Sequence, residues 1–298
     1  MRKQPSIVKV FLLAVLAIPA VCLAWGPDGH MAVGMIADHY LTPSARQEVG
    51  KILGGDRLGD HRVANWPDFI RGNKDYDRIY PGNHKWHYID IDVKTAETNF
   101  ALPSGGDDVV DQIEFWQKEL GNKTNTVERR RDALRFLVHF VADIHQPLHC
   151  AVRDDDRGGN LVPIHSFHGI RYTIDPDMAR EHPLNLHKTW DEYLVYESMD
   201  DPSAADFAKK LLAGISPAQA AAWKAGDPKT WAWESHALAV TRAYCYSDGS
   251  PLPEASDGKD IDLTEKNYVA TNVPIVREQL QKAGVRLAMI VNEALGEP

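Results

Sequence analysis

In two places in this chain an aspartate follows a histidine by four residues. His139 and Asp143 lie in the segment FLVHFVADIHQPLH, and His187 and Asp191 lie in NLHKTWD. Residues four apart lie on one face of an α-helix, so each pair can present an imidazole and a carboxylate to one metal ion. The first pair stands in an almost wholly apolar stretch, where a carboxylate with no partner costs several kcal/mol. This context predicts a metal site rather than a surface ion pair.

Imidazole and carboxylate ligands suit zinc, although nitrogen and oxygen ligands alone leave manganese, iron and cobalt open. Thiolate ligands are not expected, because only Cys150 and Cys245 lie beyond the first 24 residues. These two cysteines form either one disulfide or two separate buried thiols, and the sequence leaves both interpretations open.

Helical elements must position these side chains. Apolar residues recur at helical spacing over residues 31–40, and Thr42 can cap a second helix that begins at Pro43. Pro147 should end the helix that carries His139, because proline lacks the amide N–H and biases the preceding residue away from helix. Further helices are predicted over 107–120, 127–146, 186–196, 204–213, 217–224, 228–246 and 263–295.

The remaining segments contain few strands. Residues 54–84 are rich in Gly, Asp, Asn and Arg and are predicted to be irregular, whereas 86–93 alternate enough for a short extended segment. Residues 153–185 predict a loop with a short β-hairpin. The expected fold class is therefore mainly α, a single-domain helical bundle with at most a short β-hairpin.

The first 24 residues have the features of a secretory signal peptide. Arg2, Lys3 and Lys9 precede an apolar run over 10–24, which at about 1.5 Å per residue is too short to span a bilayer core of roughly 30 Å. The small residue Ala24 predicts cleavage before Trp25. Lipid attachment at Cys22 is the weaker alternative. We therefore expect a secreted or periplasmic protein without a membrane anchor.

Composition limits the function classes. Of the 298 residues, 44% are hydrophobic and 25% are charged, which excludes a disordered or collagen-like chain. No linker-like shift in composition divides it, so one domain is expected. Loss of the three basic leader residues, with no acidic one, changes the formal net charge from −9 to −12. Such a chain lacks the broad basic surface of most nucleic-acid binders, so any phosphate binding must be local.

Six motifs occur in order along the chain. They are Trp25-Gly-x-x-Gly-His30, Trp66-Pro67-Asp68 with Arg71, Trp86-His87-Tyr88-Ile89-Asp90, His139-Phe-x-x-Asp143-x-His145-Gln-Pro-Leu-His149, Gly158-Gly159-Asn160 and Asn185-Leu-His187-x-x-Trp190-Asp191. Together they resemble the S1/P1 family of three-zinc single-strand nucleases and 3′-nucleotidases, over about residues 25–191. The resemblance implies a zinc-dependent endonuclease that cuts single-stranded DNA and RNA to 5′-phosphorylated products, with 3′-nucleotidase activity on 3′-nucleotides. A monomer is expected, with residues 25–298 as the catalytic domain.

The resemblance also implies how three Zn²⁺ ions are held. The ligands of one zinc are Asp68, His87, His139 and Asp143. Those of its neighbour are Asp143 as a bridge, His30, and the amino nitrogen and carbonyl oxygen of Trp25. Those of the third zinc are His149, His187 and Asp191. Because the Trp25 amine exists only after the leader is cut, metal loading would depend on processing.

Four further residues receive roles from the same resemblance. Asp90 matches a position that orients the attacking water, and Arg71 matches one that contacts the phosphate in the transition state. Asn160 matches a base-contacting position, and Tyr88 offers a ring for stacking. Only an unstacked base can reach such a pocket, which gives a physical reason for a preference for single strands.

Two other functions remain as alternatives. A zinc phospholipase C is expected to share the three-zinc helical plan, but with a glutamate in place of Asp191 and a shorter interval before the last histidine. A non-catalytic zinc-binding protein would not need Asp90 or Arg71. His145 is predicted to be a core or supporting residue, and His87 is preferred to His84 as a ligand because His87 lies between Trp86 and Tyr88.

Overall fold

The computed structural model describes residues 25–103, 105–167, 184–199, 203–257 and 261–296. The predicted signal peptide lies outside these residues. Within them helices dominate, and the fold class is confirmed. The longer helices are α1 (Gly26–Tyr40), α2 (Pro43–Leu53), α6 (Val109–Gly121), α7 (Val127–Asp143), α11 (Ala204–Ala213), α13 (Pro228–Leu238) and α14 (Tyr268–Leu295).

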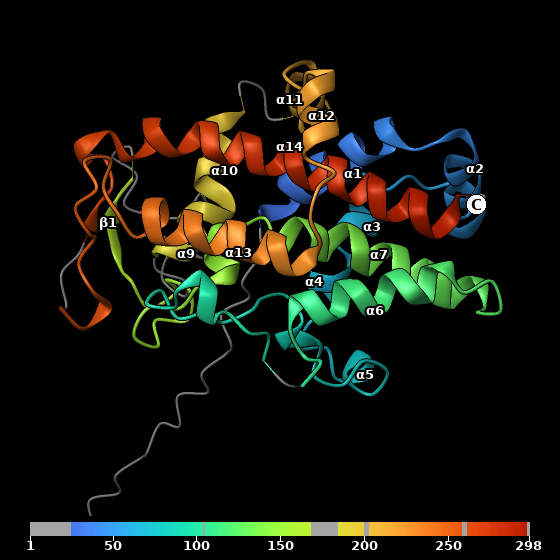
Figure 1. The fold of residues 1–298 in the computed structure, drawn as a ribbon, viewed down its shortest axis with the longest axis horizontal. Helices are drawn as coiled ribbons and strands as arrows, with labels where there is room; N and C mark the ends of the chain where they lie inside the picture. The colour runs from blue at the N-terminus through green and yellow to red at the C-terminus, as the bar shows by residue number, and fades with distance from the viewer. Residues whose placement is uncertain (1–24, 104, 168–183, 200–202, 258–260, 297–298) are drawn as a thin grey trace, which may run out of the picture.

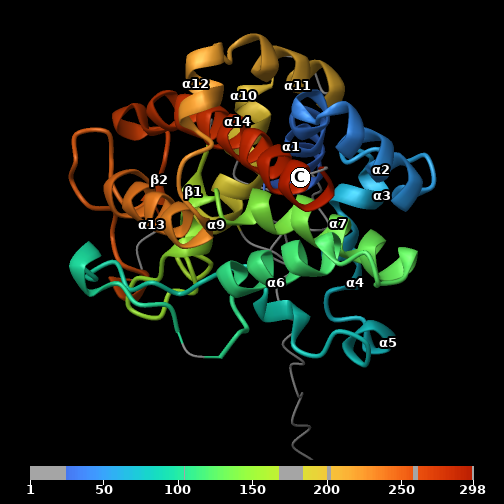
Figure 2. The same cartoon turned by 45° about the vertical axis from the view of Figure 1, so that its right-hand side comes forward.

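Helices α1, α7 and α14 pack against one another and form the centre of the bundle, and α6 packs along α7 (Figures 1 and 2). Helices α1 and α14 approach so closely at Gly284 that a side chain there would collide with α1. A Cβ built on Gly284 of α14 would lie 2.4 Å from Cγ2 of Ile36 on α1. Ile36 is fully buried, so this crossing belongs to the hydrophobic core.

The helix boundaries follow local chemistry. Thr42 accepts a hydrogen bond from the backbone N–H of Ala45 and caps α2, as predicted. Asp108 caps α6 by accepting from the N–H groups of Val110 and Asp111. Helix α7 ends at Asp143, three residues before the predicted end at 146. The metal-ligating pattern therefore occupies its last turns.

The short hairpin predicted within 153–185 has a counterpart in an antiparallel bridge between Pro163 and Asn185. Beside it, the N–H of Ile164 donates to the carbonyl oxygen of Leu184, and the N–H of Leu186 donates to that of Val162. The sequence did not predict that strand β1 (Ile164–Ser166) also pairs in parallel with β2 (Ile261–Asp262), a segment far along the chain. Residues 168–183 lie outside the described structure. Local strand propensity does not specify a partner, and here the partner comes from the chain between α13 and α14. The short sheet lies at the opposite end of the molecule from α2 (Figure 1).

The predicted irregularity of 54–84 is wrong in part. The segment contains α3 (His61–Ala64), α4 (Trp66–Ile70), α5 (Lys74–Asp77) and the 3₁₀ turn η1 (Asn83–Lys85). Helices this short have no strong periodicity and depend on tertiary packing. Trp66 supplies it, because its ring contacts the rings of Tyr80 and Phe136 edge-on.

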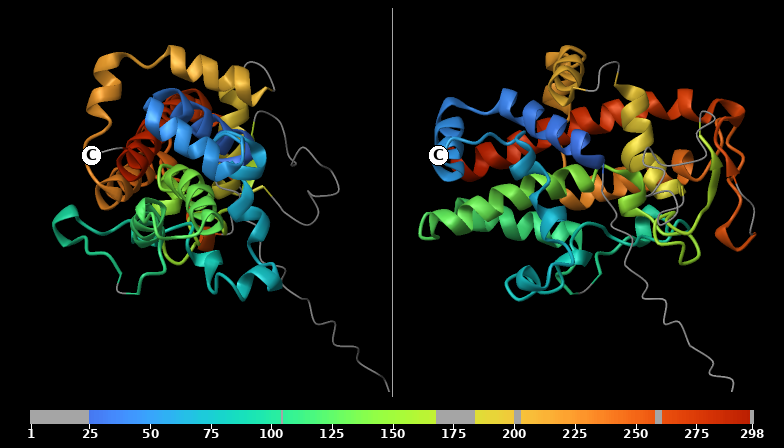
Figure 3. Two further views of the ribbon diagram at one scale, coloured as in Figure 1. Left: turned by 90° about the vertical axis from the view of Figure 1, so that its right-hand side faces the viewer. Right: turned by 180° about the vertical axis from the view of Figure 1, so that it is seen from behind.

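Two predicted helices are interrupted. The segment 186–196 is α9 (Leu186–Lys188), a π-helical turn (Thr189–Tyr193) and α10 (Leu194–Ser198). The segment 228–246 is α13 followed by a second π-helical turn (Ala239–Ala243). The helices α11 and α12 (Pro217–Ala222) cross outside α14 and cover one side of the bundle (Figure 3).

Two other expectations are decided by the fold. Cys150 and Cys245 are both free thiols, which donate to the carbonyl oxygens of Ile144 and Val240, so the interpretation as two separate thiols is confirmed. Cys150 is buried as expected, whereas Cys245 is only partly buried. None of the described helices is long and apolar enough to cross a membrane.

Candidate metal centre

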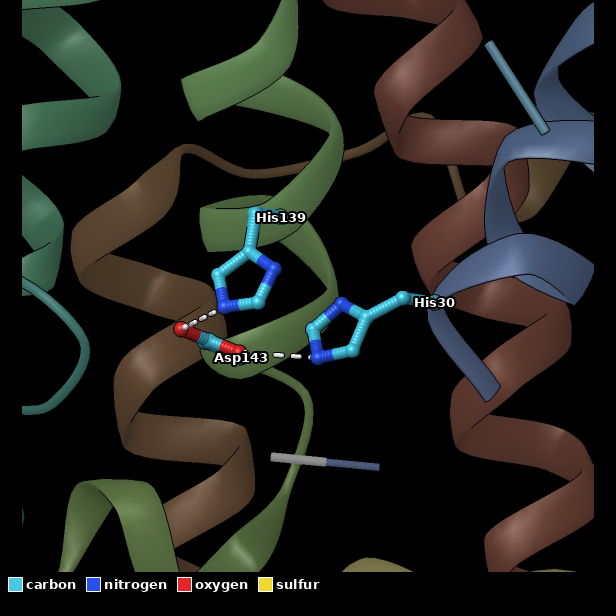
Figure 4. Close-up of side chains that lie close together, drawn as sticks. All are labelled: His30, His139 and Asp143. Carbon is cyan, nitrogen blue, oxygen red and sulfur yellow. Dashed lines mark ion pairs between the residues drawn. The ribbon is translucent and has the colours of Figure 1, made fainter. Parts of the chain in front are cut away.

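Helices α1 and α7 bring together a first group of His30, His139 and Asp143 (Figure 4). Nε2 of His30 lies 3.5 Å from Oδ1 of Asp143, and Nε2 of His139 lies 3.5 Å from the other oxygen, Oδ2. The two imidazole rings stack with centroids 3.9 Å apart. One carboxylate thus faces two imidazoles from different helices.

A second group adds Asp68 from α4 and His87, which follows η1. Oδ1 of Asp68 lies 3.5 Å from Nε2 of His139 and 3.8 Å from Nδ1 of His87. The same His87 nitrogen lies 3.0 Å from Oδ2 of Asp143. His139 and Asp143 therefore connect the first and second groups into one cluster.

A third group consists of His149, His187 and Asp191. Oδ1 of Asp191 lies 3.7 Å from Nε2 of His149, and Oδ2 lies 3.3 Å from Nε2 of His187. The predicted i, i+4 pair is preserved although a π-helical turn begins between its members. The side chain of Gln146 donates to Oδ1 of Asp191 at 2.6 Å and fixes that carboxylate.

Backbone carbonyl groups orient three of the imidazoles. In each ring Nδ1 lies within hydrogen-bond distance of a carbonyl oxygen, which directs Nε2 into the metal group. The pairs are His139 with Ala64 at 2.9 Å, His149 with His87 at 2.7 Å, and His187 with Gly158 at 2.7 Å. Such outer contacts are the usual support of metal-binding histidines.

The donor atoms fit metal ions. Among the described residues, Oδ1 of Asp68, Nε2 of His149 and Nε2 of His187 are buried and have no hydrogen-bond partner. Buried polar atoms normally have one, so this cluster of unsatisfied nitrogen and oxygen donors requires another explanation. Each of the three adjacent imidazole–carboxylate groups has donor atoms that could hold a divalent cation.

Burial and nearby charges keep the imidazoles of His87 and His149 in the neutral form that binds metal. Burial, followed by the nearby charge of Arg71, holds the pKa of His87 well below its usual range, and burial with His187 does the same to the pKa of His149. These rings are neutral, as a ligand must be. Burial also disfavours charge on His139, but Asp143 and Asp68 outweigh it and raise its pKa to about 9. A metal ion must displace a proton from His139.

One pocket of about 680 Å³ opens beside the third group and is lined by His149 and His187. All four residues predicted to act on substrate also line it, namely Arg71, Tyr88, Asp90 and Asn160. The Arg71 guanidinium lies 3.9 Å from Asp68. Burial, followed by the charges of Asp156 and Asp155, raises the pKa of Asp90.

The sequence prediction missed several residues that line this pocket, above all Arg157 and Leu161. The signal was present, because Arg157 immediately precedes the Gly158-Gly159-Asn160 motif. His84 lines the pocket but belongs to none of the metal groups found in the described residues, whereas His87 does.

Trp25 lies at the edge of the metal cluster. It is fully buried, and its indole N–H donates to the carbonyl oxygen of Ala142 at 2.7 Å. On the other side, a Cβ built on Gly26 would lie 3.4 Å from the carbonyl oxygen of Asp191. The first residues of α1 are therefore held between the chain beside Asp143 and the chain at Asp191.

His145 is a supporting residue, as predicted. It is buried, its Nδ1 lies 2.7 Å from the carbonyl oxygen of Val141, and its Nε2 accepts from Arg286 at 2.9 Å. Trp190 is also a core residue and donates to the hydroxyl of Tyr268. Neither residue faces the pocket in the described structure.

A helical bundle that gathers three imidazole–carboxylate groups beside one pocket has the architecture of a multinuclear metallohydrolase.

Comparison with known proteins is more specific: the chain belongs to the S1/P1 nuclease family, whose family model matches residues 25–296. It is similar to Nuclease P1 of Penicillium citrinum (27% identical; 91% of this chain and 98% of the relative). It is also similar to Nuclease S1 of Aspergillus oryzae (25%; 96% of each chain) and Endonuclease 1 of Arabidopsis thaliana (25%; 99% and 95%). The chain is therefore a nuclease, a hydrolase of phosphodiester bonds in nucleic acid.

Proposed function

We propose that this nuclease uses three Zn²⁺ ions to hydrolyse single-stranded DNA and RNA to 5′-phosphorylated products, and that it also removes the phosphate of 3′-nucleotides. The observation that carries the proposal is the position of the pocket, which is lined by ligands of the third group together with a carboxylate, Asp90, and a cation, Arg71. A storage site would need the imidazoles and carboxylates but neither of these residues.

The ligand sets are assigned residue by residue. One ion is held by Asp68, His87, His139 and Asp143, and its neighbour by Asp143, His30 and the amine and carbonyl oxygen of Trp25. The third is held by His149, His187 and Asp191. The buried position of Trp25 beside Ala142 supports its inclusion. Zinc in such sites polarises phosphoryl oxygens, lowers the pKa of water toward about 7 and stabilises the leaving oxygen.

The chain's own residues orient the reactants. Asp90 accepts a hydrogen bond from the attacking water and takes up its proton, which the raised pKa of this carboxyl favours. The Arg71 guanidinium donates to the non-bridging oxygens of the scissile phosphate, where negative charge grows in the transition state. The broken bond is P–O3′, so the phosphate remains on the 5′ side of the next nucleoside.

Tyr88 and Asn160 select single strands in this proposal. Both line the pocket, and Tyr88 offers a ring face on which a base can stack while Asn160 offers an amide for the base edge. A base paired in a duplex cannot insert without first leaving the stack, which costs a few kcal/mol. Single strands avoid that cost.

We further propose that the leader is removed before Trp25, that the enzyme is secreted or periplasmic, and that residues 25–298 act as one catalytic domain in a monomer. The basic residues and short apolar run of the leader support this. Of the two alternatives, the phospholipase C is disfavoured by the family match and by Asp191 at the position where a glutamate is expected.

The test uses the processed protein that begins at Trp25. Metal content is measured by mass spectrometry, and hydrolysis is followed on single-stranded DNA, RNA, duplex DNA, 3′-AMP and phosphatidylcholine vesicles. The proposal expects three zinc ions, rapid cleavage of both single strands to 5′-phosphates, release of phosphate from 3′-AMP, and loss of activity with a chelator. Cleavage of phosphatidylcholine without cleavage of nucleic acid would overturn it.

A further inference from the structure

The active-site pocket contains a second arginine for which the proposed chemistry has no role. Arg157 lines the pocket together with His149 and His187. Its side chain is exposed, and no hydrogen bond or ion pair joins the guanidinium to any described residue. The other pocket arginine, Arg71, differs because it is only partly exposed and lies beside Asp68.

The backbone holds Arg157 in an unfavourable conformation. Its φ is 56°, in the left-handed region, and Gly158 and Gly159 follow with φ of 62° and 83°. A residue other than glycine in a sparsely populated backbone region costs on the order of 1–3 kcal/mol and persists only where its surroundings fix it. Here Asn160 contributes, because its side-chain amide donates to the Arg157 carbonyl oxygen at 2.9 Å.

A buried carboxylate anchors the same loop. Asp156 is only 2% exposed, and its Oδ1 accepts hydrogen bonds from the backbone N–H of Arg153 and from the hydroxyl of Tyr244. The Arg153 guanidinium in turn donates to the carbonyl oxygens of Leu252 and Pro253. The backbone of Arg157 is therefore held in place at the pocket wall, and its side chain is free to reach a ligand in the pocket.

The two arginines lie beside different metal groups. Arg71 is next to Asp68 of the second group, whereas Arg157 directly precedes Gly158, whose carbonyl oxygen contacts His187 of the third group. A polynucleotide carries one phosphate per linkage, and a guanidinium binds phosphate oxygens through paired N–H donors. The chain has a formal net charge of −9, so its overall charge does not attract a polyanion. A single arginine in the pocket can still recognise the charge of a phosphate.

We propose that Arg157 binds the phosphate next to the scissile one, so that the enzyme prefers substrates with two adjacent charged linkages. This inference rests on the proposed function, because the scissile phosphate must lie at the metal cluster. It makes Arg157 a specificity-determining residue that favours oligonucleotides over substrates with a single phosphate.

Three trithymidylates test the proposal. One has two phosphodiester linkages, and in each of the others one linkage is a neutral methylphosphonate. Each replacement exchanges one charged oxygen for a methyl group and leaves the bases and the length equal. Because the neutral linkage is not cleaved, kcat/KM is expressed per cleavable linkage. We expect the processed, metal-loaded enzyme to show about tenfold lower kcat/KM for at least one of the neutralised trinucleotides, the size of effect that one charge-assisted phosphate contact gives.

Arg157→Asn is the variant, because asparagine tolerates the left-handed backbone. We expect the ratio of kcat/KM between the fully charged and the neutralised trinucleotide to fall toward one, and Arg157→Lys to restore part of it. Arg62→Gln is the matched control, since Arg62 is exposed, pairs with Asp56 and does not line the pocket. The control should keep the wild-type ratio.

A wild-type ratio of one, or a ratio that survives in Arg157→Asn, overturns the proposal. So does an equal loss of the ratio in Arg62→Gln, which would indicate overall charge. If the wild type cleaves none of the trinucleotides, the proposed function fails instead. Calorimetric binding of the same three compounds then tests Arg157 separately, because binding requires no turnover.

Discussion

The indole N–H of Trp25 donates to the carbonyl oxygen of Ala142 at 2.7 Å, which ties the start of α1 to the last turn of α7. Ala142 immediately precedes Asp143, the carboxylate that faces His30 and lies nearest to His87. The position of Trp25, the residue just before α1, is therefore coupled to the centre of the metal cluster. Cleavage of the chain before Trp25 would therefore free an amine beside the metal cluster.

Retention of Ala24 ahead of Trp25 should lower metal content from three ions to two and reduce kcat by more than about tenfold. The added peptide bond converts the Trp25 amine into an amide, which is a poor metal ligand. Metal content is measured by mass spectrometry on the protein with and without this single residue. One extra residue at the carboxyl terminus is the control. Full metal content and rate in the Ala24 form would contradict the ligand assignment.

Substitutions in different groups should remove different numbers of ions. Asp143→Asn changes the carboxylate that we propose as the bridge between the first two ions, so we expect metal content to fall from three ions to one. His187→Asn affects only the third group and should leave two. Both variants should lose most activity, so the metal count distinguishes them. Equal counts in the two variants would show that Asp143 does not bridge.

The metal-free protein should lose stability as the pH rises from about 6.5 to about 9. The pKa of His139 is raised to about 9 in the folded state, against 6.5 as its ordinary value, so its protonated form stabilises the fold below 6.5. That contribution disappears as the pH passes through the folded-state pKa. Thermal unfolding with a chelator across this range measures the effect.

Two controls belong to that measurement. The metal-loaded protein should not show the same decrease, because the metal has already replaced the proton on His139. His139→Gln should not show it either, since the titrating group is gone. A metal-free wild type whose melting temperature stays flat between pH 6.5 and 9 would refute the raised pKa.

Asp155→Asn should shift the acidic limb of the kcat/KM profile to lower pH. Burial is the main cause of the raised pKa of Asp90, and the charges of Asp156 and Asp155 add to it. Removal of one negative charge lowers that pKa, so Asp90 keeps its basic form at lower pH. Asp155 has a φ of 60°, which asparagine tolerates. An unmoved acidic limb would argue against Asp90 as the base.

A pair of glycine substitutions should change stability in opposite directions. Gly284→Ala would place a methyl group 2.4 Å from Ile36 and should destabilise the fold by about 1–3 kcal/mol. Gly50→Ala in α2 meets no described atom within 4 Å, and should stabilise it by about 0.5–1 kcal/mol through helix propensity. Urea denaturation measures both. A destabilised Gly50→Ala would show that α2 is constrained in another way.

The sequence by itself determined the features that depend on local geometry. Helical periodicity placed His139 with Asp143 and His187 with Asp191, and the side chains lie 3.5 and 3.3 Å apart. The cap at Thr42 and the mainly helical fold class were predicted on the same basis. The ordered motifs identified the family. These properties are encoded within a few residues of one another, so no knowledge of the packing was required.

Only the tertiary structure decided how distant segments meet. It packed α1 against α14 at Gly284, paired β1 with the distant β2, and placed Arg157 in the pocket beside the third metal group. Such contacts depend on how the surfaces of two helices fit together, as at Gly284 and Ile36. Local sequence patterns do not indicate which helix surfaces will fit. Spacing along a helix fixes which side chains share a face, whereas packing fixes what that face contacts.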